Sequence, residues 1–496
     1  MSRSSITLDG LLRAQARSGP GRPAIRTPGG VVTFAELDAA AGSFASWLAA
    51  ELDAPQQPVA ITNALVPEFA AAYYGVVRSG NTVVVLNPLL PAERLVHVLA
   101  TGGVRIAVVT AEVADRLAHV RDCLPLLTAI VPLDALPSGA GPILAEPDSA
   151  RTACVQFTSG TTGLPKGVRL TDHNVATNAR QVATAHRLDE TSVTVNHLPT
   201  YHPMHLNAAV AAGAVQILCA DADSVNALAA VDAHRATHFY SLPVRLARLA
   251  ADPRLRGLRL TARPSFLSGG SALPARVAET LHAHFGVPVA QGYGLAEMSP
   301  LTHSDDPIDP TIGSVGRPVF DTECRITDLD TGDLLACGER GEVRVRGPQL
   351  MSGYLGREDT PEIDADGWFA TGDVGYLDRG GRLVLVDRIK DVFKCDNWLV
   401  APSEIEEVLG RHDSVTDCVV VDLPDEFRGH VAAALVVLDR ATGATGAGIA
   451  TWANAQLPEY QQLQAIAVTQ NIPRSPNGKV SRRDLREIVR RAKASE

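Results

Sequence analysis

Hydroxyl, glycine and lysine residues are concentrated in one ten-residue segment, Thr158-Ser-Gly-Thr-Thr-Gly-Leu-Pro-Lys-Gly167, directly after the apolar run 153–157. A loop of this composition offers backbone N–H groups, rotatable hydroxyls and one ammonium group, which can together hold the phosphates of a nucleotide. It is not a Walker loop, because glycine rather than Ser or Thr follows Lys166. An ordinary surface loop is the alternative, which the combination of four hydroxyls with a Pro-Lys-Gly end disfavours.

Further along the chain, other segments combine a functional side chain with turn-forming residues. These segments are Ser268-Gly-Gly-Ser271, Gln291-Gly-Tyr-Gly-Leu-Ala-Glu297, Trp368-Phe-Ala-Thr-Gly-Asp373, Asp387-Arg-Ile-Lys-Asp391 and Pro473-Arg-Ser-Pro-Asn-Gly-Lys479. If each residue is considered alone, the simpler interpretation is that Tyr293 is a core aromatic and Glu297 a surface carboxylate. Lys390 and Lys479 would likewise be ordinary solvated lysines. Their occurrence together in one chain favours a shared site.

The elements that must position these residues follow from the apolar pattern. Strand-like runs alternate with amphipathic segments, the strands at 58–61, 82–86, 106–110 and 129–132 and the helices at 34–52 and 92–99. This alternation predicts α/β layers with largely parallel sheets. Strict alternation at 342–346 predicts a half-exposed antiparallel strand, and a turn at Gly380-Gly381 precedes a second strand at 382–386. A helix from about Ser403 then opens an α+β unit, and 443–448 is expected to be a loop.

Composition limits the class of protein. A chain of 496 residues, 46% hydrophobic and 20% charged, is expected to form at least two globular domains. Its formal charge of -10 argues against nucleic-acid binding, and the Arg-rich segment 482–491 is expected to be a solvated helix face. Seven widely spaced cysteines fit reduced thiols in the cytoplasm. No signal peptide is recognisable, and the apolar run 206–220 is too short to span a membrane.

The segments above, in this order, resemble the signatures of the adenylate-forming superfamily, which contains acyl- and aryl-CoA ligases, peptide-synthetase adenylation domains and luciferases. The resemblance extends from about residue 5 to about residue 488. It implies an acyl-CoA synthetase-like α/β fold, with a large N-terminal domain of several subdomains and a small mobile α+β C-terminal domain. The expected boundaries are 1–387 for the N-terminal AMP-binding domain, 388–391 for the hinge and 392–496 for the C-terminal domain.

Activation of a carboxylate by ATP brings an anionic oxygen to the α-phosphate of a polyanion. Repulsion between two unit charges at about 4 Å is on the order of several kcal/mol at intermediate dielectric, so positive charge, N–H donors and a metal are required. The resemblance implies that ATP and Mg²⁺ are bound, with Lys166 as the charge partner of the phosphates. The residues implied at the phosphates and the nearby turns are Thr158, Ser159, Gly160, Thr161, Thr162, Gly163, Gly270, Ser271, Gly292, Gly294 and Ala296. Thr162 and Glu297 are the implied magnesium ligands.

The same resemblance assigns the remaining nucleotide contacts. Tyr293 would stack on adenine, and Asp373 with Arg388 would bind the ribose hydroxyls. Lys390 matches the position about which the small domain rotates, and Lys479 would bridge the substrate carboxylate and the nucleotide before that rotation. Ala296 stands where the family most often has threonine, and the lost hydroxyl removes a contact worth about 1 kcal/mol.

Three histidines, His197, His202 and His205, surround the segment Leu198-Pro-Thr-Tyr-His202. A metal site is the alternative, but no Cys or carboxylate lies at ligand spacing. The segment resembles the family's aromatic-histidine motif at the mouth of the acyl pocket, with His202 as the matching residue. No aspartate occurs between His197 and Leu218, which argues against a free α-amino acid as substrate.

The resulting hypothesis is an AMP-forming acid–thiol ligase that adenylates a small aryl or medium acyl acid and transfers the acyl group to coenzyme A. Asn397 stands where the family has a glycine in the wall of the pantetheine tunnel, with Trp398 beside it. A carrier-protein thiol or a nitrogen nucleophile is therefore the alternative acceptor. A non-catalytic nucleotide- or acyl-binding regulator is the alternative of another class. The retention of Lys166, Glu297, Asp373, Arg388 and Lys479 counts against it.

Overall fold

The computed structural model describes residues 6–140, 148–158, 164–357, 359–396, 398–474, 480 and 482–493. The chain divides into two compact units. The first unit contains Met1–Glu323 and Val345–Phe369, and the second contains Cys324–Arg344 and Ala370–Glu496. Within the described residues, no helix is both long and apolar enough to cross a membrane.

One sheet of the first unit has seven strands in the order β18-β8-β7-β4-β3-β5-β6. The pairs β7–β4, β4–β3, β3–β5 and β5–β6 are parallel, whereas β8 pairs antiparallel with both β7 and β18. The central strands are continuous apolar runs, typical of a parallel sheet covered on both faces. Four of these strands confirm the sequence-based expectations. The bounds are β3 Pro58–Thr62, β4 Thr82–Leu86, β5 Ile106–Val109, β6 Ala129–Pro132, β7 Thr152–Phe157, β8 Gly167–Thr171 and β18 Gly353–Tyr354.

The other sheet of the first unit has nine strands in the order β15-β14-β13-β12-β11-β9-β10-β1-β2. From β1 to β13 the neighbouring strands are parallel, so their carboxyl ends meet at one edge. In open parallel sheets this edge is where ligands bind. The bounds are β1 Pro23–Thr27, β2 Gly30–Thr33, β9 Val193–His197, β10 Val215–Leu218, β11 His238–Ser241, β12 Ser265–Ser268, β13 Val289–Gly294, β14 Leu301–Ser304 and β15 Arg317–Pro318.

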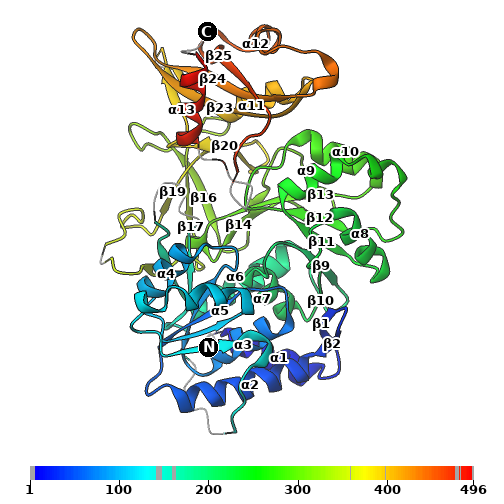
Figure 1. Ribbon diagram of the computed structural model, residues 1–496, viewed down its shortest axis with the longest axis vertical. Coiled ribbons are helices and arrows are strands. Elements are labelled where there is room, and N and C mark those ends of the chain that lie inside the picture. Colours follow the sequence, from blue (N-terminus) through cyan, green and yellow to red (C-terminus); the bar gives the residue numbers. More distant parts are fainter. Residues whose placement is uncertain are drawn as a thin grey trace. The chain divides into compact units, whose positions relative to one another are not determined.

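Helices cover both faces of these sheets (Figure 1). The outer face of β9 to β13 packs on α8, α9 and α10 around a core that includes Phe239 and Phe266. On the other side, α6 contacts strands of both sheets. Capping boxes begin α2 and α6, with Thr33 and Thr171 as the N-caps. The bounds are α1 Leu8–Ser18, α2 Phe34–Glu51, α3 Pro67–Arg78, α4 Ala92–Thr101, α5 Ala111–Ala118, α6 Asp172–Ala185, α7 Pro203–Ala212, α8 Ser224–Ala233, α9 Pro243–Ala251 and α10 Ala275–Phe285.

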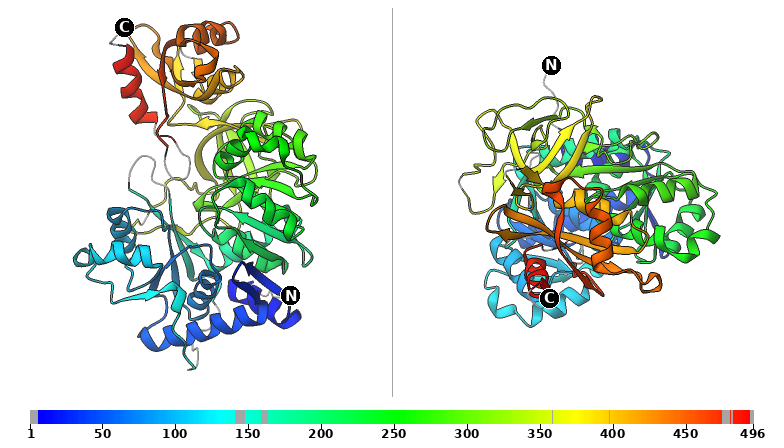
Figure 2. Two further views of the ribbon diagram at one scale, coloured as in Figure 1. Left: turned by 45° about the vertical axis from the view of Figure 1, so that its right-hand side comes forward. Right: turned by 90° about the horizontal axis from the view of Figure 1, so that it is seen from above.

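The second unit contains most of a four-stranded sheet, β16-β17-β19-β20, and a five-stranded sheet in which β22-β21-β24-β23 is extended by β25 on β24. Helices α11, α12 and α13 pack on the five-stranded sheet, and Figure 2 shows α13 in red beside it. The bounds are β16 Glu323–Thr327, β17 Gly341–Arg346, β19 Phe369–Leu377, β20 Leu383–Arg388, β21 Phe393–Cys395, β22 Trp398–Val400, α11 Pro402–Gly410, β23 Val415–Asp425, β24 Gly429–Leu438, α12 Gly446–Asn454, β25 Leu463–Thr469 and α13 Arg482–Lys493.

Two local expectations are wrong in this unit. The helix α12 begins inside the expected loop 443–448, because the Thr445 side chain accepts the Gly448 N–H and caps the helix. The Arg-rich face of α13 is only partly solvated. Arg482 pairs with Glu406 at 2.8 Å and approaches Asp387 at 3.6 Å. These carboxylates come from distant segments of the chain.

Candidate active site

The two ends of the hydroxyl-rich loop are hydrogen-bonded to each other. The loop joins β7 to β8, which pair antiparallel. The Thr158 N–H donates to the Lys166 carbonyl at 3.0 Å, and the Lys166 N–H donates to the Thr158 hydroxyl at 3.1 Å. Ser159, Gly160, Thr161, Thr162 and Gly163 lie outside the described residues. The structure therefore fixes where the loop leaves and re-enters the sheet.

Lys166 and Glu297 are brought together through Tyr354. The Lys166 ammonium lies 4.7 Å from the centre of the Tyr354 ring, a cation–π contact. The Tyr354 hydroxyl donates to Glu297 Oε1 at 2.9 Å. Burial, and next the adjacent Glu297 carboxylate, raise the pKa of Tyr354 above its usual range, so this hydroxyl stays protonated and remains a donor. Lys166 also pairs with Glu362 at 3.4 Å.

Tyr354 and Glu362 were not predicted from the sequence. Tyr354 follows a glycine in the short strand β18, and Glu362 lies in an irregular segment. The Gly353-Tyr354 pair was the only local signal. Their relevance depends on the pairing of β18 with β8, which places Tyr354 opposite Val168, two residues after Lys166.

The donor set around Glu297 suits Mg²⁺ better than a metal held by the protein alone. Among the described residues, no three His, Cys, Asp or Glu side chains gather where they could share a metal ion. Mg²⁺ is commonly held by one or two carboxylates together with substrate phosphates and water. The half-buried Glu297 carboxylate, already oriented by Tyr354, fits that pattern.

The segment 291–297 forms the end of β13 and a tight turn. A Cβ at Gly294 would lie 2.3 Å from the Pro300 carbonyl oxygen, so only glycine fits there. Ala296 begins a 3₁₀ turn, Ala296–Met298, that carries Glu297. The Glu297 carbonyl accepts the Met351 N–H at 2.8 Å, which links the turn to the segment before Tyr354.

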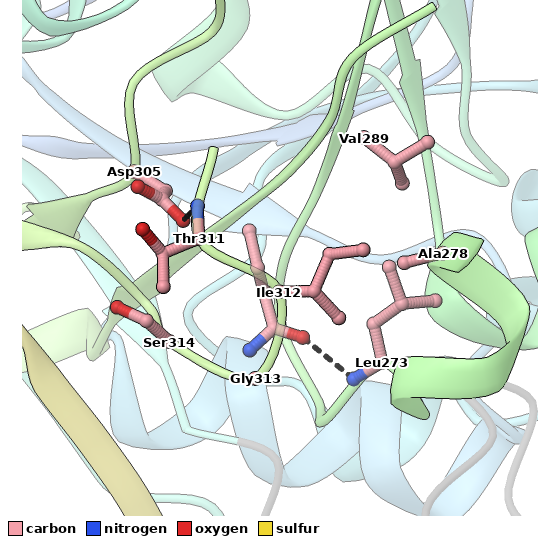
Figure 3. Close-up of a pocket in the computed structure, with 9 residues that line it drawn as sticks. Leu273, Ala278, Val289, Asp305, Thr311, Ile312, Gly313 and Ser314 are labelled. Atoms are coloured by element: carbon pink, nitrogen blue, oxygen red, sulfur yellow. Dashed lines mark hydrogen bonds between the residues drawn. The ribbon is translucent and has the colours of Figure 1, made fainter. Parts of the chain in front are cut away.

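The loop after β12 is held beside the end of β13. The Leu273 N–H donates to Gln291 Oε1 at 2.6 Å. Within this loop Gly270 has a φ of 88°, a conformation that favours glycine, and Ser271 is exposed. Gln291 and Leu273 are among the residues that line a small pocket. Figure 3 shows Asp305 and Thr311 on the side of this pocket away from Leu273. The adjacent ends of parallel strands thus bring the predicted segments 268–271 and 291–297 together.

His202 is a half-buried, neutral imidazole at the N-terminus of α7. Its Nδ1 accepts the Met204 N–H at 3.2 Å, which leaves the proton of the neutral ring on Nε2. Burial lowers the pKa of His202 to about 4. The His205 ring is centred 6.1 Å away. His202 is therefore suited to donate a hydrogen bond rather than to carry a positive charge near neutral pH.

In the second unit, the predicted ribose-binding pair is formed. Asp373 on β19 and Arg388 on β20 are cross-strand partners, with Arg388 Nε 3.2 Å from Asp373 Oδ1. The Asp373 side chain is 8% exposed. Lys390 is exposed two residues after β20, and partial desolvation lowers its pKa. Lys479 and Asn397 lie outside the described residues.

Comparison with known proteins identifies the family. The model of the AMP-binding enzyme family matches residues 12–355, and the AMP-binding enzyme C-terminal domain matches residues 404–479. A long-chain-fatty-acid–CoA ligase of Bacillus subtilis is 30% identical over 97% of this chain and 94% of its own length. A feruloyl-CoA synthase of Amycolatopsis is 30% identical over 95% of this chain and 97% of its own. The chain belongs to the AMP-binding enzyme family.

Solved structures agree with this membership. O-succinylbenzoate coenzyme A synthetase of Bacillus subtilis, in complex with ATP and a magnesium ion, matches with a TM-score of 0.85 and 27% identity. The match covers 96% of this chain and 98% of that one. The predicted superfamily, the acyl-CoA synthetase-like α/β fold and the acid–thiol ligase class are confirmed. The roles of individual residues and the boundaries at 387 and 391 stay predictions.

Proposed function

We propose that this protein activates a small carboxylic acid with ATP as an acyl-adenylate, releases pyrophosphate, and transfers the acyl group to coenzyme A. The observation that carries the proposal is the arrangement Lys166–Tyr354–Glu297 beside the paired ends of the hydroxyl-rich loop. It provides one ammonium group and one oriented carboxylate where the loop leaves the sheet.

Each group has a definite task in this reaction. Lys166 and the loop from Thr158 to Gly163 bind the β- and γ-phosphates and offset their charge as pyrophosphate leaves. Glu297, with Thr162, binds Mg²⁺, which supplies charge neutralisation at the phosphates. Tyr293, with the loop containing Gly270 and Ser271, receives the adenine.

The resemblance assigns the ribose to residues of the second unit. The Asp373 carboxylate accepts hydrogen bonds from the ribose hydroxyls, and Arg388 holds that carboxylate in place. Lys390 belongs to the hinge about which the small domain turns. Lys479 approaches the acid carboxylate during adenylation and is withdrawn before thioester formation.

The His202 imidazole is neutral, and its Nε2–H can donate a hydrogen bond. It therefore supports a region that binds the acid without carrying a charge of its own. A carrier-protein thiol or a nitrogen nucleophile is the second candidate acceptor, which Asn397 in the expected tunnel wall favours. A non-catalytic regulator would not require Lys479 in addition to a complete set of nucleotide contacts. A cytoplasmic location stays a prediction.

Acid-dependent exchange of pyrophosphate into ATP, measured over a panel of aromatic and aliphatic acids, tests the proposal. We expect exchange with at least one aryl or medium acyl acid, and consumption of coenzyme A when it is added. Exchange without consumption of coenzyme A would favour the other acceptors. The absence of exchange with every acid would contradict the adenylation step.

A further inference from the structure

Asn196, near the end of β9, is fully buried, and neither of its side-chain polar atoms has a hydrogen-bond partner among the residues that the structure describes. Leaving an amide unpaired away from water costs about 1–3 kcal/mol per group in proteins. Leucine would fill a similar volume without that cost. The Asn196 amide is therefore suited to form hydrogen bonds with a bound molecule that is not part of the folded chain.

The surroundings of Asn196 are polar and aromatic. Asn196 and Tyr240 are register partners on the parallel strands β9 and β11, so their side chains project from the same face of the sheet. The His205 ring of α7 is centred 4.3 Å from the Tyr240 ring, and His205 Nδ1 is likewise buried and unpartnered. Leu267 and Ala290, on the next two strands, form an apolar cluster with Tyr240.

This group of side chains is uncharged near neutral pH. Burial lowers the pKa of His205 well below its usual value and lowers that of His186 to about 3. Burial also raises the pKa of Tyr240 above its usual range. His186 Nδ1 and the Tyr240 hydroxyl share a hydrogen bond of 3.0 Å, which occupies that end of the tyrosine. The side-chain atoms without a hydrogen-bond partner in this group therefore belong to Asn196 and His205, and both side chains are neutral.

The position of these residues relates them to the proposed acyl site. Strands β9, β11, β12 and β13 end in His197, Ser241, Ser268 and the segment 291–294, whose carboxyl ends form the edge described above. His205 lies one helical turn after His202, and the two rings are 6.1 Å apart. Asn196 is therefore close to the region that receives the acid, on the face of the sheet that carries Tyr240.

We propose that Asn196, together with His205, determines substrate specificity by binding an uncharged hydrogen-bonding group on the tail of the acid, such as the hydroxyl of a hydroxyaryl acid. This inference rests on the proposed adenylation of a carboxylic acid. A hydroxyl both donates and accepts, so it can pair with an amide and an imidazole nitrogen together. A purely aliphatic tail would leave Asn196 and His205 unpaired.

Matched acids test this inference on the intact enzyme. Benzoates and cinnamates that carry either a hydroxyl or a methyl group at the same ring position are compared by kcat/KM in pyrophosphate exchange. We expect the best hydroxylated acid to exceed its methyl counterpart by about tenfold or more. Asn196→Leu should remove this preference or reverse it. A wild-type preference for the methyl acids, or an unchanged ratio in Asn196→Leu, would overturn the inference.

Thermal unfolding without substrate gives a second, independent test. Asn196→Leu should leave Tm unchanged or raise it, because no intramolecular hydrogen bond is lost. Asn178→Leu is the matched control, since its buried amide bonds Gln181 and the Leu301 carbonyl and its loss should lower Tm. An equal loss of Tm in both variants would mean that Asn196 is structural. If no acid supports exchange, the proposed function fails, and the Tm comparison still decides whether Asn196 lacks a partner.

Discussion

The Tyr354 hydroxyl donates a 2.9 Å hydrogen bond to the carboxylate of Glu297, and the two residues lie 57 positions apart in the chain. The bond fixes the orientation of the carboxylate proposed to bind magnesium. The same tyrosine ring lies against Lys166. One side chain thus orders both the anionic and the cationic group of the proposed phosphate site.

Replacing Tyr354 with phenylalanine should weaken the magnesium site while leaving the ring against Lys166. A lost hydrogen bond to a charged group is worth about 1.5–3 kcal/mol. We therefore expect kcat/KM for exchange to fall by about tenfold or more, with a higher Mg²⁺ concentration needed for half-maximal rate. Tyr460→Phe, in the second unit, should match the wild type. If the exchange rate of Tyr354→Phe depended on the Mg²⁺ concentration as it does in the wild type, the proposal that Glu297 binds the metal would be contradicted.

Glu362 is expected to compete with the nucleotide phosphates for Lys166. The pair is 3.4 Å long and its lysine is 42% exposed, so it contributes only about 0–1 kcal/mol. Glu362→Gln should lower the KM for ATP by about two- to fivefold, most clearly at low ionic strength. Glu323→Gln removes an exposed partner of Arg346 and serves as the control. A higher KM for ATP in Glu362→Gln would indicate that Glu362 itself assists binding.

Arg482 is expected to stabilise the second unit. Its side chain is 16% exposed and pairs with Glu406, whose pKa is raised by burial. Removing one partner of such a pair costs about 3 kcal/mol, because the other charge stays buried. Arg482→Met should therefore lower Tm in calorimetry. Arg490→Gln, which affects an exposed pair on the same helix, should not. Equal values of Tm for the two variants would contradict this account.

Buried histidines should make the fold sensitive to acid. Burial lowers the pKa of His186 from 6.5 to about 3, so the unfolded chain binds its proton first as the pH falls. The contribution of His186 to stability is thus complete above pH 6.5 and is lost between pH 6.5 and 3. His186→Gln should reduce the slope of unfolding free energy against pH by up to one proton, about 1.4 kcal/mol per pH unit.

A second buried group sharpens this pH experiment. Asp172 acts in the opposite direction, because burial raises its pKa to about 6 and the folded state then holds its proton more tightly. Its contribution decreases as the pH rises from about 4 to 6. A wild-type stability that increases on acidification below pH 6 would show that Asp172 dominates.

Lys479 should be required for adenylation only. Lys479→Ala should reduce acid-dependent exchange by about 10²-fold or more, the scale of losing a positioned transition-state charge. A supplied acyl-adenylate should still react with coenzyme A, because Lys479 is proposed to be withdrawn in that step. Equal losses in the two assays would contradict the rotation of the small domain.

Local sequence patterns were sufficient to predict several of the strands. The apolar run 82–86 forms β4, because a strand that is buried on both faces is apolar throughout. The strict alternation at 342–346 falls in β17, because a strand that is buried on one face alternates between apolar and polar residues. Asp373 and Arg388 were predicted together from the resemblance, and the pairing of β19 with β20 brings them into contact.

Contacts between distant segments could not be predicted in this way. Glu362 is 196 residues from Lys166, and nothing in its own segment marks it as a partner. Arg482 was expected to be solvated because its neighbours are charged, but Asp387 and Glu406 reach it from β20 and α11. Asn196 resembles any polar residue in a strand until its burial and lack of partners are known.

The register of β19 and β20 determines whether Asp373 and Arg388 lie on the same face of the hairpin. The strands are joined through the tight turn at Gly380-Gly381, and successive side chains in a strand point to opposite faces. A slip of β20 by one residue against β19 would carry the guanidinium to the far surface while the hairpin still formed. The proposed ribose contact thus depends on the pairing of two strands as well as on two side chains, a limit that substitution experiments alone would not reveal.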